Sequence, residues 1–247
     1  MPEDVLQICQ SFAKRRPSWR QPGRDTAILM QRLSDWAFMA GSSMFVVRSG
    51  PRAEARTKDL VVEVTGLLRS TAYPVFWYLS EPIVTHAGST LNVILKSLIF
   101  QALRHDPTIV SRDHRLGNIR AFQGEHKLAE WISLVCLILS KIKQCFVVVE
   151  TEYLYRIAGR DGAQVRQILE TFGQIFDSVT ATGSTMKLLV VSYGGRASLS
   201  MSSGNIPWIV ASVNPPLPAS RRSKQHLTPQ FRTGLGRHTL QLRLITP

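Results

Sequence analysis

The chain has 247 residues, of which 44% are hydrophobic and 19% charged; this composition suits one domain with appendages and excludes wholesale disorder. The net charge of +13 is uneven, being +4 over residues 1–60, +1 over 61–177 and +8 over 178–247. A near-neutral centre argues against a nucleic-acid surface across the whole domain, and the basic end predicts a basic tail.

Several features bear on the compartment. The N-terminal run MPEDVLQICQ has acidic residues where a signal peptide has basic ones, and it lacks an apolar core. The longest mostly apolar stretch, residues 131–139, is too short to span a membrane. The 3 cysteines are too few for a disulfide framework, and the histidines and cysteines lack the spacing of metal ligands. We therefore expect a soluble cytoplasmic protein without membrane contact, with a nuclear location as the alternative.

Taken in chain order, residues 11–25 mix charge, proline and glycine and predict a loop or linker. A helix is expected over 26–39. Apolar strand-like runs then alternate with helical periodicity. The strands are expected at 44–47, 74–79, 145–149, 186–191 and 208–213. The helices are expected at 58–68, 91–103 (capped by Ser89 or Thr90), 125–143 (largely buried) and 163–179.

Five apolar strands separated by helices predict an α/β fold with three layers, α/β/α, around a five-stranded, mainly parallel sheet. We divide the chain into an N-terminal linker and helix (1–40), the α/β domain (41–213) and a proline-rich, basic tail (214–247) that we expect to be poorly ordered.

The segment after the first expected strand resembles a phosphate-binding loop, G-x-x-x-x-G-K-[ST]. Gly50 fits the first glycine, Ala55 stands at the second, Arg56 at the lysine and Thr57 at the hydroxyl position. In such loops backbone N–H groups surround the phosphates, a cation meets the terminal phosphates and a hydroxyl binds Mg²⁺. The alternative is an ordinary loop and helix start, with Thr57 or Ser49 as the N-cap.

This loop departs from the pattern in ways that weaken phosphate binding. Ala55 adopts positive φ less easily than glycine, and Pro51 removes one N–H donor. Glu54 adds a negative charge, and the planar group of Arg56 does not reproduce a compact ammonium. Together these changes can abolish hydrolysis while the fold persists.

Two later strands also end in polar residues. The run Phe146–Val149 is followed by Glu150, as in a Walker B strand, and Glu150 could reach Mg²⁺ through water. The run Leu188–Val191 is followed by Ser192, where a sensor residue would contact the terminal phosphate. The simpler interpretations are that Glu150 and Glu152 are solvated loop acids and that Ser192 begins a turn.

On these motifs, residues 26–213 resemble the P-loop NTPases of the additional-strand kind (AAA, STAND and NACHT-like). The runs GPRAEARTKDLVVEV, PVFWYLS and LNVILKSLIFQALRH resemble P-loop-like proteins of fungi related to that group. The resemblance implies ATP or GTP with Mg²⁺ as cofactor. It makes Gly50, Ala55, Arg56, Thr57 and Ser192 nucleotide positions, Thr57 and Glu150 metal positions, and Glu150 the catalytic residue.

The sequence thus favours a degenerate P-loop NTPase-like domain that binds purine nucleotide weakly or not at all and acts as a switch or scaffold; if active, it is a slow nucleoside triphosphatase. One alternative is a non-enzymatic domain with a decayed site and protein partners. Another is nucleic-acid binding through the tail, where Arg221–Lys224 is basic. STAND-type relatives carry winged-helix and repeat regions after this core, so a fragment, a truncated product and a stand-alone remnant all remain open.

Overall fold

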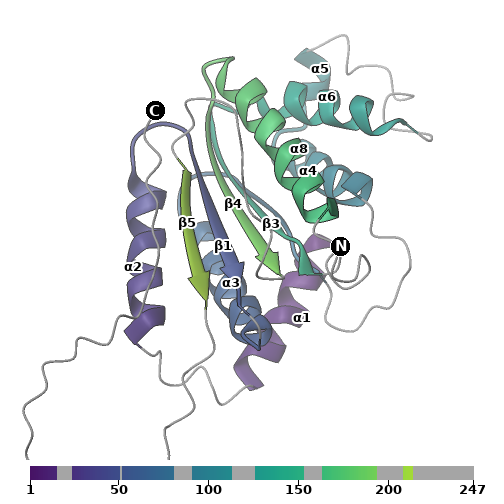
Figure 1. Cartoon of the computed structure of the whole chain (residues 1–247). Helices are drawn as coiled ribbons and strands as arrows, with labels where there is room; N and C mark the ends of the chain where they lie inside the picture. The colour runs from purple at the N-terminus through teal and green to yellow at the C-terminus, as the bar shows by residue number, and fades with distance from the viewer. Residues whose placement is uncertain are drawn as a thin grey trace, which may run out of the picture.

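The computed structural model describes residues 1–15, 24–50, 52–80, 91–112, 126–152, 163–193 and 208–213 (Figure 1). Its helices are α1 (Pro2–Arg15), α2 (Arg24–Phe38), α3 (Glu54–Arg69), α4 (Leu91–His105), α5 (Thr108–Arg112), α6 (Leu128–Leu139) and α8 (Ala163–Thr180). Its strands are β1 (Ser43–Ser49), β2 (Val75–Tyr78), β3 (Gln144–Glu150), β4 (Thr185–Tyr193) and β5 (Trp208–Val213).

The five strands form one sheet in the order β2-β3-β4-β1-β5, and every neighbouring pair is parallel. Strand β4 therefore lies between β1 and β3. The α/β prediction is confirmed, with all five strands at the expected positions. Because the strands are parallel, their carboxyl ends lie at one edge of the sheet, where open α/β sheets bind ligands.

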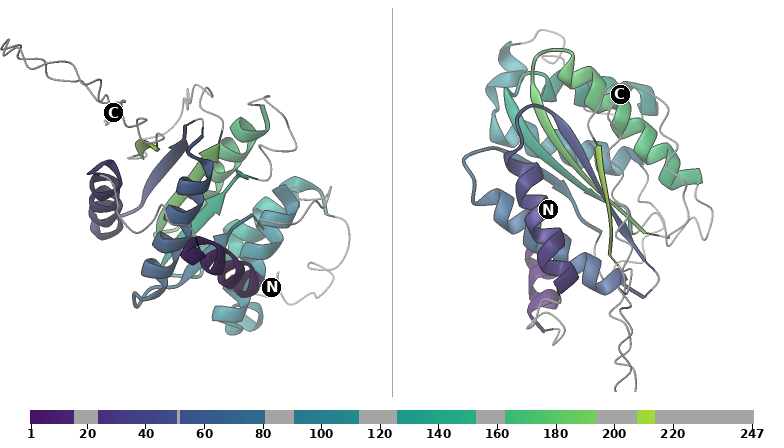
Figure 2. Two further views of the ribbon diagram at one scale, coloured as in Figure 1. Left: turned by 90° about the horizontal axis from the view of Figure 1, so that it is seen from below. Right: turned by 60° about the vertical axis from the view of Figure 1, so that its left-hand side comes forward.

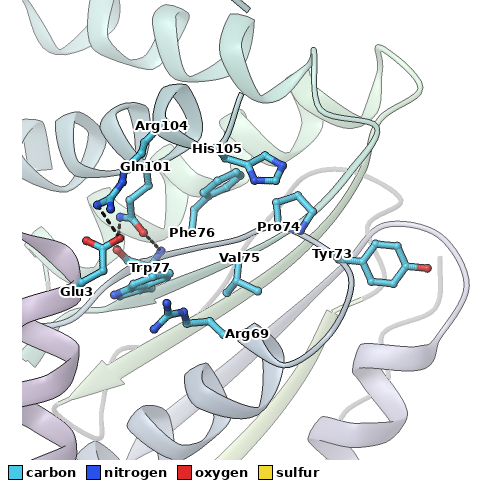
Figure 3. Close-up of a pocket in the computed structure, with 10 residues that line it drawn as sticks. All are labelled: Glu3, Arg69, Tyr73, Pro74, Val75, Phe76, Trp77, Gln101, Arg104 and His105. Atoms are coloured by element: carbon cyan, nitrogen blue, oxygen red, sulfur yellow. Dashed lines mark hydrogen bonds and ion pairs between the residues drawn. The ribbon is translucent and has the colours of Figure 1, made fainter. Parts of the chain in front are cut away.

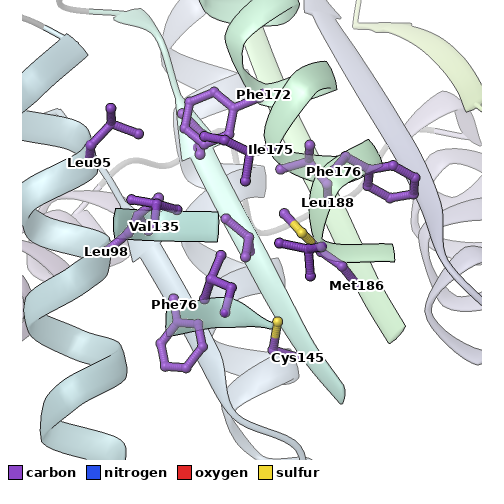
Figure 4. Packing of buried hydrophobic residues seen from close by; sticks show 14 of the residues in the cluster. Phe76, Leu95, Leu98, Val135, Cys145, Phe172, Ile175, Phe176, Met186 and Leu188 are labelled. Carbon is purple, nitrogen blue, oxygen red and sulfur yellow. The ribbon is translucent and has the colours of Figure 1, made fainter. Parts of the chain in front are cut away.

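Helices cover both faces of the sheet (Figures 1 and 2). Strand residues alternate between the two faces, as the pleat requires. In β3, Cys145, Val147 and Val149 pack in the core beneath α4, α5, α6 and α8 (Figure 4). Phe146 and Val148 pack in the second core, beneath α1, α2 and α3. The three-layer prediction is thereby confirmed.

The N-terminal segment departs from the expected loop or linker at both ends of residues 11–25, whose middle part, 16–23, lies outside the described residues. Helix α1 runs on to Arg15, and α2 already begins at Arg24. Leu6, Cys9 and Ala13 of α1 are buried at helical spacing, and its first turn is acidic while its last turn is basic, which suits the helix dipole. Leu6 and Cys9 share the second core with β1, so α1 packs in the same core as the sheet.

On the opposite face of the sheet, α4 and α8 match the expected helices 91–103 and 163–179 to within two residues, whereas α5 and α6 differ from expectation. Helix α6 is shorter than the expected 125–143, with Trp131, Val135, Ile138 and Leu139 buried. Helix α5 was not expected from the sequence. The caps proposed at Ser89 and Thr90, and the basic tail over 214–247, lie outside the described residues.

Candidate functional site

A buried polar cluster lies at the carboxyl edge of the sheet. Glu150 ends β3, Tyr193 ends β4, Ser80 follows β2, and Lys58 comes from α3. The side chain of Glu150 is fully buried, and that of Lys58 is 7% exposed. These groups come from four separate parts of the chain, and the sheet topology brings them together. We call Lys58, Ser80, Glu150 and Tyr193 the carboxylate cluster.

The carboxylate of Glu150 accepts hydrogen bonds at both oxygens. The Tyr193 hydroxyl donates to Oε1 at 2.6 Å, and the Ser80 backbone N–H donates to Oε2 at 2.9 Å. The Lys58 ammonium also donates to Oε2 and forms an ion pair with it. Lys58 donates in addition to the Ser80 carbonyl and lies 3.6 Å from Glu152 Oε2. The buried charges are thus compensated by protein groups, as buried ions must be.

Opposing effects act on the pKa of Glu150. Burial, the largest effect, raises the pKa because the charged form loses its hydration. The charge and hydrogen bond of Lys58, and the hydroxyl of Tyr193, oppose this rise, whereas the charge of Glu152 adds to it. The charged form of Glu150 therefore depends on Lys58 remaining in place.

The predicted phosphate loop is a tight turn. The Gly50 N–H donates to the Val213 carbonyl at 2.7 Å, and the Ala53 N–H donates to the Gly50 carbonyl at 3.1 Å. Helix α3 begins directly afterwards, at Glu54. In a phosphate loop the N–H groups converge on the anion; here the N–H groups of Gly50 and Ala53 bind protein carbonyls instead.

The side chains of the expected loop point in several directions. Ala55 is exposed in the first turn of α3. Arg56 donates from Nη2 to the Thr26 hydroxyl of α2. Thr57 is buried, and its hydroxyl donates to Ser49 Oγ at 3.0 Å or to the Ala53 carbonyl at 2.9 Å. The cation that meets Glu150 is thus Lys58 rather than Arg56.

Ser192 lies within β4, opposite Arg48 of β1 in the sheet register, and is 6% exposed. The interpretation that Ser192 begins a turn is therefore wrong, because this residue is still paired in the strand. Burial lowers the pKa of Arg48, its neighbour across the sheet. Residues 194 and 195, the rest of that proposed turn, lie outside the described residues.

The start of α3 and the acids at the end of β3 also differ from their simpler interpretations. The N-cap of α3 is Ala53, which makes no side-chain capping bond, so neither Thr57 nor Ser49 is the cap.

Glu150 and Glu152 are not solvated loop acids, because they are 0% and 9% exposed. Lys58 of α3 contacts both acids, and Ser80 and Tyr193 also bond to Glu150.

Sequence reasoning missed Lys58, Tyr193 and Ser80. A signal for Lys58 existed, because it stands at helical spacing from the buried residues Val61, Val62 and Thr65, so the helical period places it on the buried face. No comparable signal in the sequence marked Tyr193 or Ser80, because it is the order of the strands in the sheet that places them beside Glu150.

A scan of protein-family models finds no match to this chain, and a search of curated proteins finds no relative of it. Among the described residues, no three histidine, cysteine, aspartate or glutamate side chains are grouped so as to hold a metal ion. Within the same ranges, no helix combines the length and apolar character needed to cross a bilayer.

Proposed function

We propose that the chain is a degenerate P-loop NTPase-like domain that works as a scaffold without binding or hydrolysing nucleotide. The observation that carries the proposal is the buried ion pair of Lys58 with Glu150. In a working site the cation would meet phosphate and the carboxylate would face the Mg²⁺ side. Here each of these charges is satisfied by the other.

The strand order supports the P-loop part of the proposal. In the additional-strand arrangement, one strand separates the phosphate-loop strand from the Walker-B-like strand. Strand β4 has that position between β1, which precedes the turn at Gly50, and β3, which ends in Glu150. The resemblance seen in the sequence and the order of the strands therefore agree.

The free energy needed to move the Lys58 ammonium from Glu150 to a phosphate can be estimated. Drawing the ammonium away would leave Glu150 buried and uncompensated, at a cost of about 3–5 kcal/mol. That cost lowers the affinity for nucleotide by about two to four orders of magnitude. The N–H groups of Gly50 and Ala53 offer no compensation, because carbonyl groups of the protein already accept from them.

The test is calorimetric titration of the full chain with ATP and with GTP, each with and without Mg²⁺. We expect no saturable heat up to millimolar nucleotide and no rise of the Tm, since a ligand that binds only the folded state would raise it. Arg56→Ala, with Arg166→Ala on α8 as a matched control, identifies binding through the loop. Any saturable nucleotide binding would overturn the proposal. Mg²⁺-dependent binding that Arg56→Ala abolishes and Arg166→Ala leaves intact would in addition restore the nucleotide-switch hypothesis.

A further inference from the structure

Strand β2 forms one edge of the sheet, and a cavity of about 290 Å³ runs beside it (Figure 3). The cavity is lined by β2 and by residues of α1, α3 and α4. Its volume lies at the lower end of the range for ligand pockets, which is enough for a short segment of chain but small for a large cofactor.

The backbone of β2 alternates in the direction of its hydrogen bonds. The Phe146 N–H donates to the Pro74 carbonyl, so residue 74 faces β3. An odd number of residues later, Trp77 faces the other way, since its N–H donates to Gln101 Oε1 at 3.0 Å and its carbonyl accepts from Gln101 Nε2 at 2.7 Å. Gln101 thus bonds to Trp77 as a peptide group of a neighbouring strand would.

The same alternation directs the N–H and carbonyl of Val75 away from β3 and toward the cavity. An edge residue with both groups directed outward is a template for pairing with another chain. Gln101 already occupies the outward N–H and carbonyl of Trp77. A partner strand can therefore pair with β2 only over a short length centred on Val75.

The charges around the cavity select the partner. Arg69 of α3 lies on one side of β2 with its guanidinium 4.6 Å from the centre of the Trp77 ring, and Arg104 and His105 of α4 lie on the other (Figure 3). Glu3 is the acidic residue of this lining, and it pairs with Arg104 at 3.1 Å. The cavity is therefore basic on balance.

We propose that the β2 edge binds a short, extended, acidic peptide segment of a partner protein. Val75 provides the backbone hydrogen bonds, and Arg69 and Arg104 attract the acidic side chains. A second copy of this edge would bring arginines against arginines. Residues 214–247 have no acidic side chain, so the charge of that segment also disfavours it as the occupant.

This inference deepens the proposed scaffold role, but its test is separate from the nucleotide titration. The probes are three labelled heptapeptides of alternating valine and threonine, which differ only in carrying glutamate, glutamine or lysine at both ends. Binding to the full chain is measured by fluorescence anisotropy at two salt concentrations. We expect the glutamate peptide to bind most tightly and the lysine peptide most weakly, with the difference shrinking at higher salt.

Two variants examine the two parts of the proposal. Val75→Pro removes the outward N–H, a change that edge strands tolerate, and should weaken binding about five-fold through one lost hydrogen bond. Arg104→Gln should weaken binding of the glutamate peptide about three-fold, while Arg166→Gln on α8 should leave it unchanged. If Val75→Pro fails to fold, hydrogen exchange of the Val75 amide in the unaltered chain replaces it, and slower exchange with the glutamate peptide is expected.

Three results would overturn the inference: no binding of any peptide, equal binding of all three, or binding that neither Val75→Pro nor Arg104→Gln weakens. A chain that fails to bind nucleotide and also fails to bind these peptides would retain the scaffold proposal without this docking site. A chain that binds both would lose the scaffold proposal and keep the docking site.

Discussion

Replacing Lys58 by methionine tests whether the carboxylate cluster is held together by compensation of buried charge. Methionine keeps most of the length and the apolar stem of lysine and removes the ammonium. Glu150, fully buried, would retain hydrogen bonds from Tyr193 and from the Ser80 N–H but lose its counter-charge. Breaking such a pair from one side costs about 3–5 kcal/mol, and we expect that decrease in the free energy of unfolding.

Two companion variants separate lost compensation from lost packing. The double variant Lys58→Met/Glu150→Gln removes both charges and leaves an amide oxygen to accept from Tyr193, so it should be more stable than Lys58→Met alone. The exposed pair of Arg104 with Glu3 supplies the control. Its arginine side chain is 59% exposed, and Arg104→Met should cost at most about 1 kcal/mol.

The pH dependence has a definite sign. A carboxyl whose pKa is higher in the folded than in the unfolded chain stabilises the fold below the unfolded pKa, and this contribution is lost as pH rises through the folded pKa. Burial raises the pKa of Glu150, and removing Lys58 removes the main opposing charge. The deficit of Lys58→Met should therefore be largest at neutral pH and shrink as the pH falls toward about 5.

The assay is urea unfolding followed by tryptophan fluorescence, which reports on the buried rings of Trp36, Trp77 and Trp131, at neutral pH and at about pH 5. The reasoning is refuted if Lys58→Met lies within about 1 kcal/mol of the unaltered chain at neutral pH. A deficit that does not change with pH would also refute it, because lost packing rather than an uncompensated carboxylate would then explain the cost.

Three further predictions concern single positions. Tyr193→Phe removes the hydroxyl that donates to Glu150 and should cost about 1.5–3 kcal/mol in urea unfolding; no change would show that the bond contributes nothing. Arg52 has φ of 64° in the turn before α3, so Arg52→Gly should stabilise the fold by about 1 kcal/mol and raise the Tm, whereas a lower Tm would contradict strain there. Burial raises the pKa of Cys145 to about 12, so its thiol should resist alkylation at pH about 8 until the chain unfolds, and rapid labelling of the folded chain would contradict this.

The fold could be predicted to a large extent because burial on both faces leaves a plain signal in the sequence. Strands such as β3 and β4 are continuous apolar runs, as expected where helices cover both faces of a parallel sheet. Helix α1 was missed because its charged and polar residues resemble a linker, while only Leu6, Cys9 and Ala13 are buried. Its acidic first turn and basic last turn were the available signals.

The site was predicted only in part, for a geometric reason. The position of Glu150 at the end of a strand follows from the apolar run before it, and the structure confirms that position. Its partner could not be read from the phosphate-loop pattern, which assigns the cation to Arg56. Successive residues of a helix are about 100° apart around its axis, so Arg56 and Lys58 differ by about 200° on α3. One side chain therefore reaches α2 and the other reaches the carboxyl edge of the sheet.

The carboxyl edge of a parallel sheet is the usual place for a ligand because strand ends and helix starts converge there. In this chain the same convergence brings Lys58 and Tyr193 into contact with Glu150, so the groups that would bind a ligand bind one another. A buried ion pair contributes little net stability, yet it penalises any arrangement that separates its partners. The carboxylate cluster would then hold the ends of β2, β3 and β4 in one relative position, which is a structural requirement for the β2 edge to bind a partner.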